Sequence, residues 1–184
     1  IVNDEGKDSL ASIPKYDGVC CIPNHFNYRQ AINGFYNEYS QLSHSIDLEK
    51  FSKLEVEPLI QNSLNFIKHI FGEQYELGLD YIKLLYEKPT QILPILCLVS
   101  EERATGKSTF IQWLKEIFEH NLTYVKGDSF NSQFNADWAN KLVVAVDEVF
   151  FDKQEITERL KFLSTTNKDK LEPKGKDRVE IDFF

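Results

Sequence analysis

The chain has 184 residues, of which 42 % are hydrophobic and 27 % charged, and its formal net charge is −8. This length allows one buried core, with or without a small helical appendage, and the composition is that of a soluble globular protein. No apolar stretch reaches the ~20 residues of a membrane span, so we expect no membrane partner. The acidic balance argues against a protein coated in positive charge for passive binding of nucleic acid.

Cysteines and chain ends indicate a cytoplasmic protein. The acidic start of the chain does not resemble a signal peptide. Because the sequence contains no Met, we expect it to be a fragment or an edited sequence. Cys20, Cys21 and His25 have metal-ligand spacing, but no second Cys/His pair completes a zinc site. We therefore expect buried or half-buried thiols in a reducing cytosol, or in the cytoplasm of the host cell if the protein is viral.

Residues 1–90 are predicted to form a loop-rich and helical, collar-like region. Loops with a short helix near 44–53 come first, and helices over 57–72 and 75–87 follow, ended by Pro89. The aromatic side chains of the loops either stack on bases or pack a small domain; they are Phe26, Tyr28, Phe35, Tyr36 and Tyr39.

Residues 91–184 alternate strands with helices, which predicts a parallel α/β core. The apolar runs 92–99 and 142–146 read as buried strands, and 122–125 as a short one. Helices are expected after the first of these strands and over 153–164, and a hairpin over 170–184 ends the chain.

The segment Glu101–Thr109 lies between an apolar strand and a helix, which is the context of a phosphate-binding loop. Its glycine permits close approach of the backbone, and the first N–H groups of the helix point at a bound anion. Lys107 would contact the β- and γ-phosphates of ATP, and the Ser108 hydroxyl would ligate Mg²⁺. The predicted cofactor-binding residues are Ala104, Thr105, Gly106, Lys107, Ser108 and Thr109. The full pattern has Gly at position 101, where this chain has Glu101.

Two carboxylates, Asp147 and Glu148, end the second apolar strand forty residues after Lys107. Ligands of α/β sheets bind at the carboxyl ends of strands. Asp147 would therefore hold Mg²⁺, and Glu148 would act as the general base that polarises the attacking water. Lys107, Asp147 and Glu148 are the predicted catalytic residues.

Three stretches in this order resemble the superfamily 3 helicases, AAA+-related ring motors, and more narrowly the helicase part of phage-type primase–helicases. They are Thr105–Thr109, Val146–Val149 and Glu172–Asp177. The resemblance covers roughly residues 57–184 and implies a P-loop NTPase core that is incomplete at its C-terminus.

The same resemblance implies partners and further site residues. The third stretch would be a hairpin in the channel of a homo-oligomeric ring, expected to be a hexamer, where Lys174 and its neighbour Lys176 contact single-stranded DNA. A primase or polymerase domain would accompany the ring. A sensor Asn and an arginine finger would follow Phe184, since the arginines present lack the spacing for that role.

Three functions compete at this point. The first is a DNA-translocating ATPase of a phage or mobile-element replication apparatus. The second is another P-loop class, a nucleotide kinase or signalling NTPase, although no Arg-rich lid is visible in the sequence. The third is a nucleotide-binding assembly module without activity, which Glu101 and the incomplete core suggest.

Overall fold

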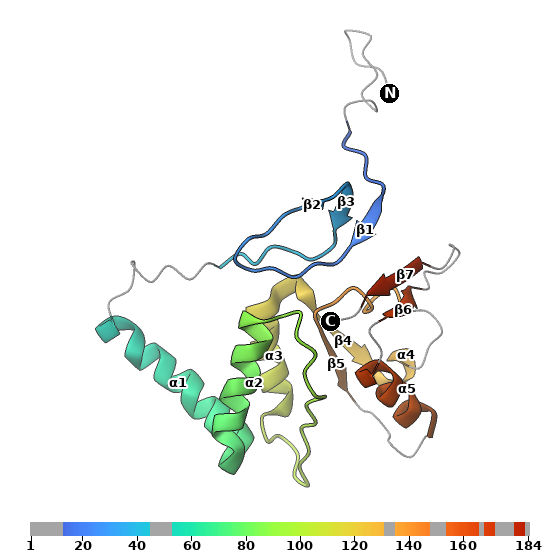
Figure 1. Ribbon diagram of the computed structural model, residues 1–184. Helices are drawn as coiled ribbons and strands as arrows, with labels where there is room; N and C mark the ends of the chain where they lie inside the picture. Colours follow the sequence, from blue (N-terminus) through green and yellow to red (C-terminus); the bar gives the residue numbers. More distant parts are fainter. Residues whose placement is uncertain are drawn as a thin grey trace, which may run out of the picture.

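The computed structural model describes residues 13–44, 53–130, 135–147, 154–165, 168–171 and 179–182. An N-terminal strand group, a pair of helices and an α/β part follow one another along the chain (Figure 1). The helices are α1 (Lys53–Phe71), α2 (Tyr75–Glu87), α3 (Lys107–Phe118), α4 (Gly127–Phe130) and α5 (Gln154–Thr165), with 3-10 turns η2 (Gly72–Gln74) and η3 (Glu119–Asn121). The strands are β1 (Gly18–Cys20), β2 (Ala31–Ile32), β3 (Phe35–Asn37), β4 (Leu122–Lys126), β5 (Val143–Asp147), β6 (Lys168–Leu171) and β7 (Val179–Asp182).

Helix α3 forms the centre of the larger core cluster. Phe110, Leu114 and Phe118 recur every four residues, so they share one face of the helix, and all three are buried with Leu122 of β4. Burying each such side chain stabilises the fold by roughly 1.5–3 kcal/mol. Side chains of α1, α2 and β5 pack around them, among them Phe66, Ile70, Phe71, Ile82, Leu85, Tyr86, Val143 and Ala145.

Strands β4 and β5 pair in parallel, from Leu122 opposite Val143 to Lys126 opposite Asp147. Alternate residues of β5 face the two sides of this sheet. Val143 and Ala145 pack against the α3 cluster, whereas Val144 and Val146 pack against a second cluster that includes Leu160 and Leu163 of α5. Helices therefore cover both faces of a parallel pair, which confirms a mixed α/β fold.

The predicted strand over 92–99 is not formed. These residues are extended, but among the described residues no strand pairs with them. Leu96 and Leu98 pack against the α3 cluster, while Ile95 and Val99 are exposed by 49 % and 88 %. The apolar run thus places alternate side chains on the core, but a strand also requires a hydrogen-bonded neighbour.

Most other predicted elements are present with small shifts. The helix predicted over 57–72 is α1, which begins at Lys53 and contains Pro58, and the helix over 75–87 coincides with α2. The hairpin predicted over 170–184 is confirmed as the antiparallel pair β6–β7, beginning at Lys168. Most of the short helix near 44–53 lies outside the described residues. None of the described helices is long and apolar enough to cross a membrane.

We predicted that the N-terminal segment begins with loops. It instead contains a three-stranded sheet. β3 lies between β1 and β2, parallel to β1 and antiparallel to β2. Asn33 and Gly34, with φ of 50° and 87°, form the tight turn between β2 and β3, where a hairpin of this kind needs left-handed residues. The buried Asn37 side chain holds the segment together through the backbone groups of Ile22 and Arg29.

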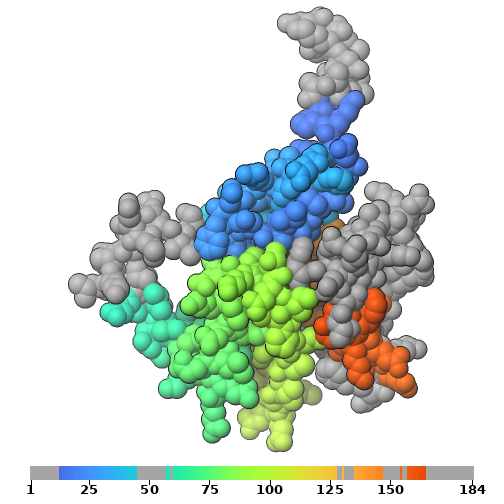
Figure 2. Space-filling view, viewed as in Figure 1, coloured from blue at the N-terminus to red at the C-terminus, as the bar shows by residue number. Residues whose placement is uncertain are grey.

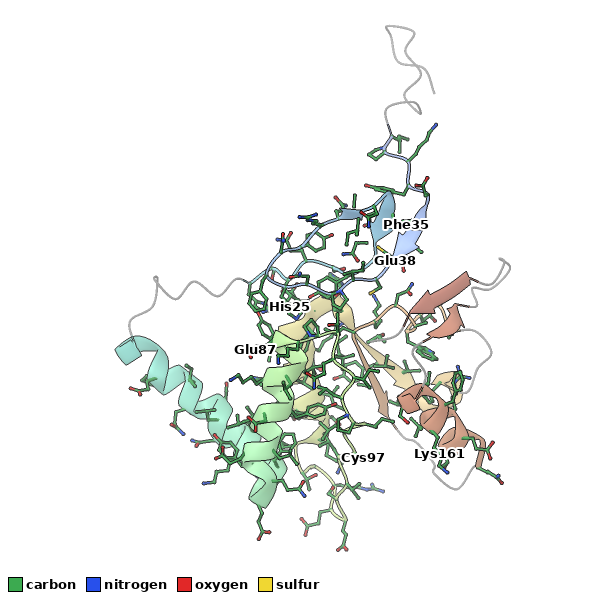
Figure 3. All side chains as sticks on the ribbon, in the orientation of Figure 1. His25, Phe35, Glu38, Glu87, Cys97 and Lys161 are labelled. Carbon is green, nitrogen blue, oxygen red and sulfur yellow. The ribbon has the colours of Figure 1, made fainter. Side chains whose placement is uncertain are left out.

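Residues 13–44 pack over the end of α2 (Figure 2) and contact the turn where α3 stops. The buried Asn121 side chain accepts a hydrogen bond from Ser40 N and donates one to Ser40 O, both at 2.8 Å. His25 lies beside the end of α2 (Figure 3), with its ring stacked on Tyr86 at 4.7 Å between centroids and its Nδ1 bonded to the Tyr39 hydroxyl. The segment is therefore docked through specific polar and ring contacts.

The aromatic side chains of this segment differ in how far they are buried. Tyr39 is 1 % exposed and belongs to the packed junction. Phe26, Phe35 and Tyr36 are at the surface, with Phe26 exposed by 69 %. Packing of a small domain therefore accounts for Tyr39, and the exposed rings keep a face open to solvent.

The junction should make stability depend on pH. Burial lowers the pKa of His25 below its ordinary 6.5, and nearby His44 lowers it further, outweighing a hydrogen bond to the Tyr86 backbone. The unfolded chain then binds a proton that the folded chain does not, so the stabilisation is complete above about pH 6.5 and is lost as the pH falls through the folded pKa. Thermal unfolding midpoints measured over this range should decrease toward acid. The variant His25→Phe, which keeps the ring stack, should show a shallower decrease, and equal slopes would contradict this role.

Candidate functional site

The predicted phosphate loop connects the extended residues 92–100 to α3. Gly106 is the N-cap of α3 and is left-handed, with φ of 91°, and Ala104 is also left-handed, with φ of 57°. A left-handed non-glycine residue costs roughly 1–2 kcal/mol, and such strain tends to gather at functional sites. The first helical N–H groups have no side-chain cap, because Gly106 cannot provide one. The loop therefore ends on uncapped backbone donors, where an anion binds favourably.

Lys107 is held across the loop by two hydroxyl groups. Its Nζ donates to the hydroxyls of Ser100 and Thr105, the latter at 3.1 Å, and these two hydroxyls are 3.0 Å apart. The Ser100 hydroxyl also donates to the Glu102 carbonyl at 2.8 Å. Sequence reasoning missed Ser100; its only signal was a polar residue directly after an apolar run. This network places the ammonium group inside the loop, beside the start of α3.

The other predicted loop residues lie at the surface. Ser108 and Thr109, in the first turn of α3, are exposed, as are Ala104, Glu101 and Glu102. The side chains of both acids are in water, where Coulomb repulsion toward an anion is weak. A hydroxyl at Ser108 remains accessible to a metal ion that a bound nucleotide would bring.

Asp147, the first carboxylate of the predicted acidic pair, ends β5 on the side of the molecule that also holds the start of α3. Helix α3 leads through η3 into β4, and β4 and β5 run parallel back along it, so the carboxyl ends of both strands lie toward the loop (Figure 1). Asp147 is the last residue of β5, opposite Lys126. Glu148 lies outside the described residues, as do Lys174 and Lys176. The structure thus brings the backbone of Asp147 to the expected edge.

Helix α1 limits the space around the loop glycine. A Cβ added at Gly106 would lie 3.1 Å from Ile70 Cδ1 and 3.7 Å from Phe66 Cε2. The Phe66 ring in turn packs against Phe110 of α3, with centroids 6.4 Å apart. The end of α1 is therefore seated directly on the loop, where the left-handed backbone favours glycine and a larger residue would also press on Ile70.

Cys21 and Arg159 make structural contacts. Cys21 Sγ donates to the Asn140 carbonyl at 3.3 Å, and burial, followed by the nearby Glu38, raises the pKa of this thiol to about 12. Cys97, expected to be buried or half-buried, is exposed. Within the described ranges no group of three or more potential metal ligands occurs. The Arg159 guanidinium lies over the Phe130 and Trp138 rings, at 5.5 and 5.4 Å, so it packs on the second core cluster.

The comparisons with known proteins indicate the fold. Residues 98–184 match the model of a family described as a family of unknown function, DUF5906. A comparison with curated proteins finds no match. Three apo structures of the NrS-1 C-terminal region superpose with TM-scores of 0.66, 0.60 and 0.59 at 22 %, 22 % and 21 % identity. They cover 94 %, 92 % and 97 % of this chain, which spans 42 %, 40 % and 42 % of theirs. The chain therefore shares their fold over about two fifths of their length.

Gly106→Ala should destabilise the protein through both backbone strain and the contact with α1. A left-handed alanine costs roughly 1–2 kcal/mol of unfolding free energy, and the contact with Ile70 adds to this. Urea unfolding measures the loss. Gly72→Ala is the matched control, because Gly72 is left-handed, with φ of 55°, but has no atom within 4 Å of an added Cβ. A loss no larger at Gly106 than at Gly72 would show that α1 does not press on the loop.

Proposed function

We propose that this chain is the nucleotide-binding part of an ATP-dependent DNA helicase or translocase of the superfamily 3 type, working in the replication of a phage or mobile element. The observation that carries the proposal is the loop at the start of α3, where Gly106, Lys107 and uncapped backbone donors converge. The parallel β4–β5 pair, which ends toward the same side, supports it. The likeness to the NrS-1 C-terminal region is one of fold and is compatible with this proposal.

In this proposal ATP and Mg²⁺ bind at the loop. The nucleotide phosphates would displace the hydroxyls of Ser100 and Thr105 from Lys107, which then neutralises the β- and γ-phosphates. Ser108 would ligate Mg²⁺ together with Asp147, and Glu148 would polarise the attacking water. The Lys107 ammonium group must break its hydrogen bonds to these two hydroxyls before it can contact the phosphates. The cost of breaking them reduces the net free energy of nucleotide binding.

Coupling to DNA would come from the hairpin that β6 and β7 begin. These strands pair from Lys168 opposite Asp182 to Leu171 opposite Val179, and in the sequence residues 172–178 connect them. Lys174 and Lys176 lie in this connection. In a homo-oligomeric ring, taken here as a hexamer, one such connection from each subunit would meet on the axis. Local positive charge there would act on a DNA strand despite the net charge of −8, because the Debye length is only about 8–10 Å.

Lys107→Ala should remove most of the ATP affinity. A hydrogen bond to a charged group contributes about 1.5–3 kcal/mol, which corresponds to roughly 10- to 150-fold in Kd. Titration of a fluorescent ATP analogue with Mg²⁺ measures the change. Lys83→Ala, which removes an exposed lysine of α2, is the matched control and should bind as the wild type does. Equal binding by wild type and Lys107→Ala would reject a phosphate loop here.

The double variant Lys174→Ala, Lys176→Ala should weaken binding of single-stranded DNA while leaving ATP binding intact. Each lost phosphate contact should flatten the dependence of log affinity on log salt by about 0.7 for single strands. Fluorescence anisotropy of a labelled oligonucleotide at several salt concentrations gives both quantities. Lys83→Ala, Lys88→Ala removes the same charge from exposed positions at α2 and should change neither. An unchanged slope in the hairpin variant would make these lysines part of a solvated turn.

A further inference from the structure

The end of α1 contacts the predicted phosphate loop through a polar bond as well as through apolar packing. His69, in the last turn of α1, has its Nε2 3.3 Å from the Thr105 carbonyl oxygen. A carbonyl oxygen only accepts, so Nε2 carries the hydrogen and donates it. The neighbouring Ile70 and Phe66 hold this turn of α1 against Gly106. The imidazole is thus brought to the loop by a packed helix.

This bond is not required to satisfy a buried polar group. The His69 side chain is exposed, and water would serve both the imidazole and the carbonyl. Its consequence is conformational, because Thr105 lies between two left-handed residues, Ala104 and Gly106. A peptide beside glycine rotates easily, since glycine tolerates both signs of φ. A bond to the Thr105 carbonyl selects one orientation of the peptide that joins Thr105 to Gly106.

The orientation of that peptide determines where the Gly106 N–H points. In a planar trans peptide the C=O and the following N–H point in opposite directions. With the Thr105 carbonyl held toward His69 and α1, the Gly106 N–H is directed away from α1. The Thr105 hydroxyl is meanwhile bound to Lys107 Nζ at 3.1 Å. Both the backbone and the side chain of Thr105 are therefore fixed around the place where the lysine ends.

We propose that His69 is a positioning residue for nucleotide binding, which sets the Thr105–Gly106 peptide so that its N–H is presented to the phosphates of a nucleoside triphosphate. This inference rests on the proposed function, and it adds a residue from outside the phosphate-loop motif. It makes α1 part of the nucleotide site. Because α1 belongs to the helical pair rather than to the α/β part, the bond also links the pair to a bound nucleotide through one peptide.

The test compares three variants of the full chain with the wild type. His69→Leu removes the donor, and we expect the affinity for a fluorescent ATP analogue with Mg²⁺ to decrease by about two- to tenfold, as loss of one hydrogen bond predicts. His69→Gln retains a side-chain N–H of similar reach and should bind within about twofold of wild type. His120→Leu changes an exposed histidine at the other end of α3 and should have no effect.

Rescue by glutamine separates positioning from packing. Wild-type affinity in His69→Leu, or an equal loss in His69→Leu and His69→Gln, would overturn the inference while the proposed function stands. We expect His69→Leu and His120→Leu to have the same thermal unfolding midpoint. If His69→Leu and His69→Gln both lost thermal stability as well as affinity for the analogue, the inference would also be overturned. Failure of the proposed function has another signature, since wild type and Lys107→Ala would then bind the analogue alike, which overturns both.

Discussion

The apolar face of α3 is the contact on which the other parts of the structure depend. Phe110, Leu114 and Phe118 join the helical pair, the sheet and the extended residues 92–99 in one cluster. A helix of twelve residues is about 18 Å long, and its two ends have different neighbours. The loop with Lys107 begins it, and the N-terminal segment docks where it ends, through Asn121. Packing of one helix face therefore fixes the distance between the candidate nucleotide site and the docked segment.

Periodicity predicted the elements that bury a face within the described chain. The i, i+4 spacing in α3 and the continuous apolar run of β5 predicted these elements because each pattern marks the apolar positions that the folded chain buries. The Asn33–Gly34 turn had an equally local signal, a known hairpin dipeptide, but it was obscured by the short strands on either side of it. The local sequence was thus sufficient to predict the long elements that bury a face. It was insufficient to predict strands of two or three residues, which form only when the segment docks on the rest of the protein.

The remaining failures concern partners that the sequence does not reveal. Residues 92–99 have strand composition, but hydrogen bonds between strands are a property of two segments, and the described chain pairs β5 only with β4. His69 and Ser100 likewise have no motif. His69 reaches Thr105 because Phe66 and Ile70 seat α1 on the loop, a tertiary contact between residues 36 positions apart. Such site residues follow from packing geometry rather than from spacing along the chain.

The departure of the loop from the full phosphate-loop pattern has a backbone explanation. A pattern glycine is needed where φ is positive or where a side chain would clash. The positive-φ residues other than glycine in the described chain are Asn33, Ala104 and Glu119, so the backbone at Glu101 is one that any residue adopts. The glycine requirement falls instead on Gly106, where φ is 91° and a Cβ would lie 3.1 Å from Ile70 Cδ1. An exposed Glu101 is therefore compatible with the loop conformation, and the strain that the loop does hold is at Ala104, next to the peptide that His69 contacts.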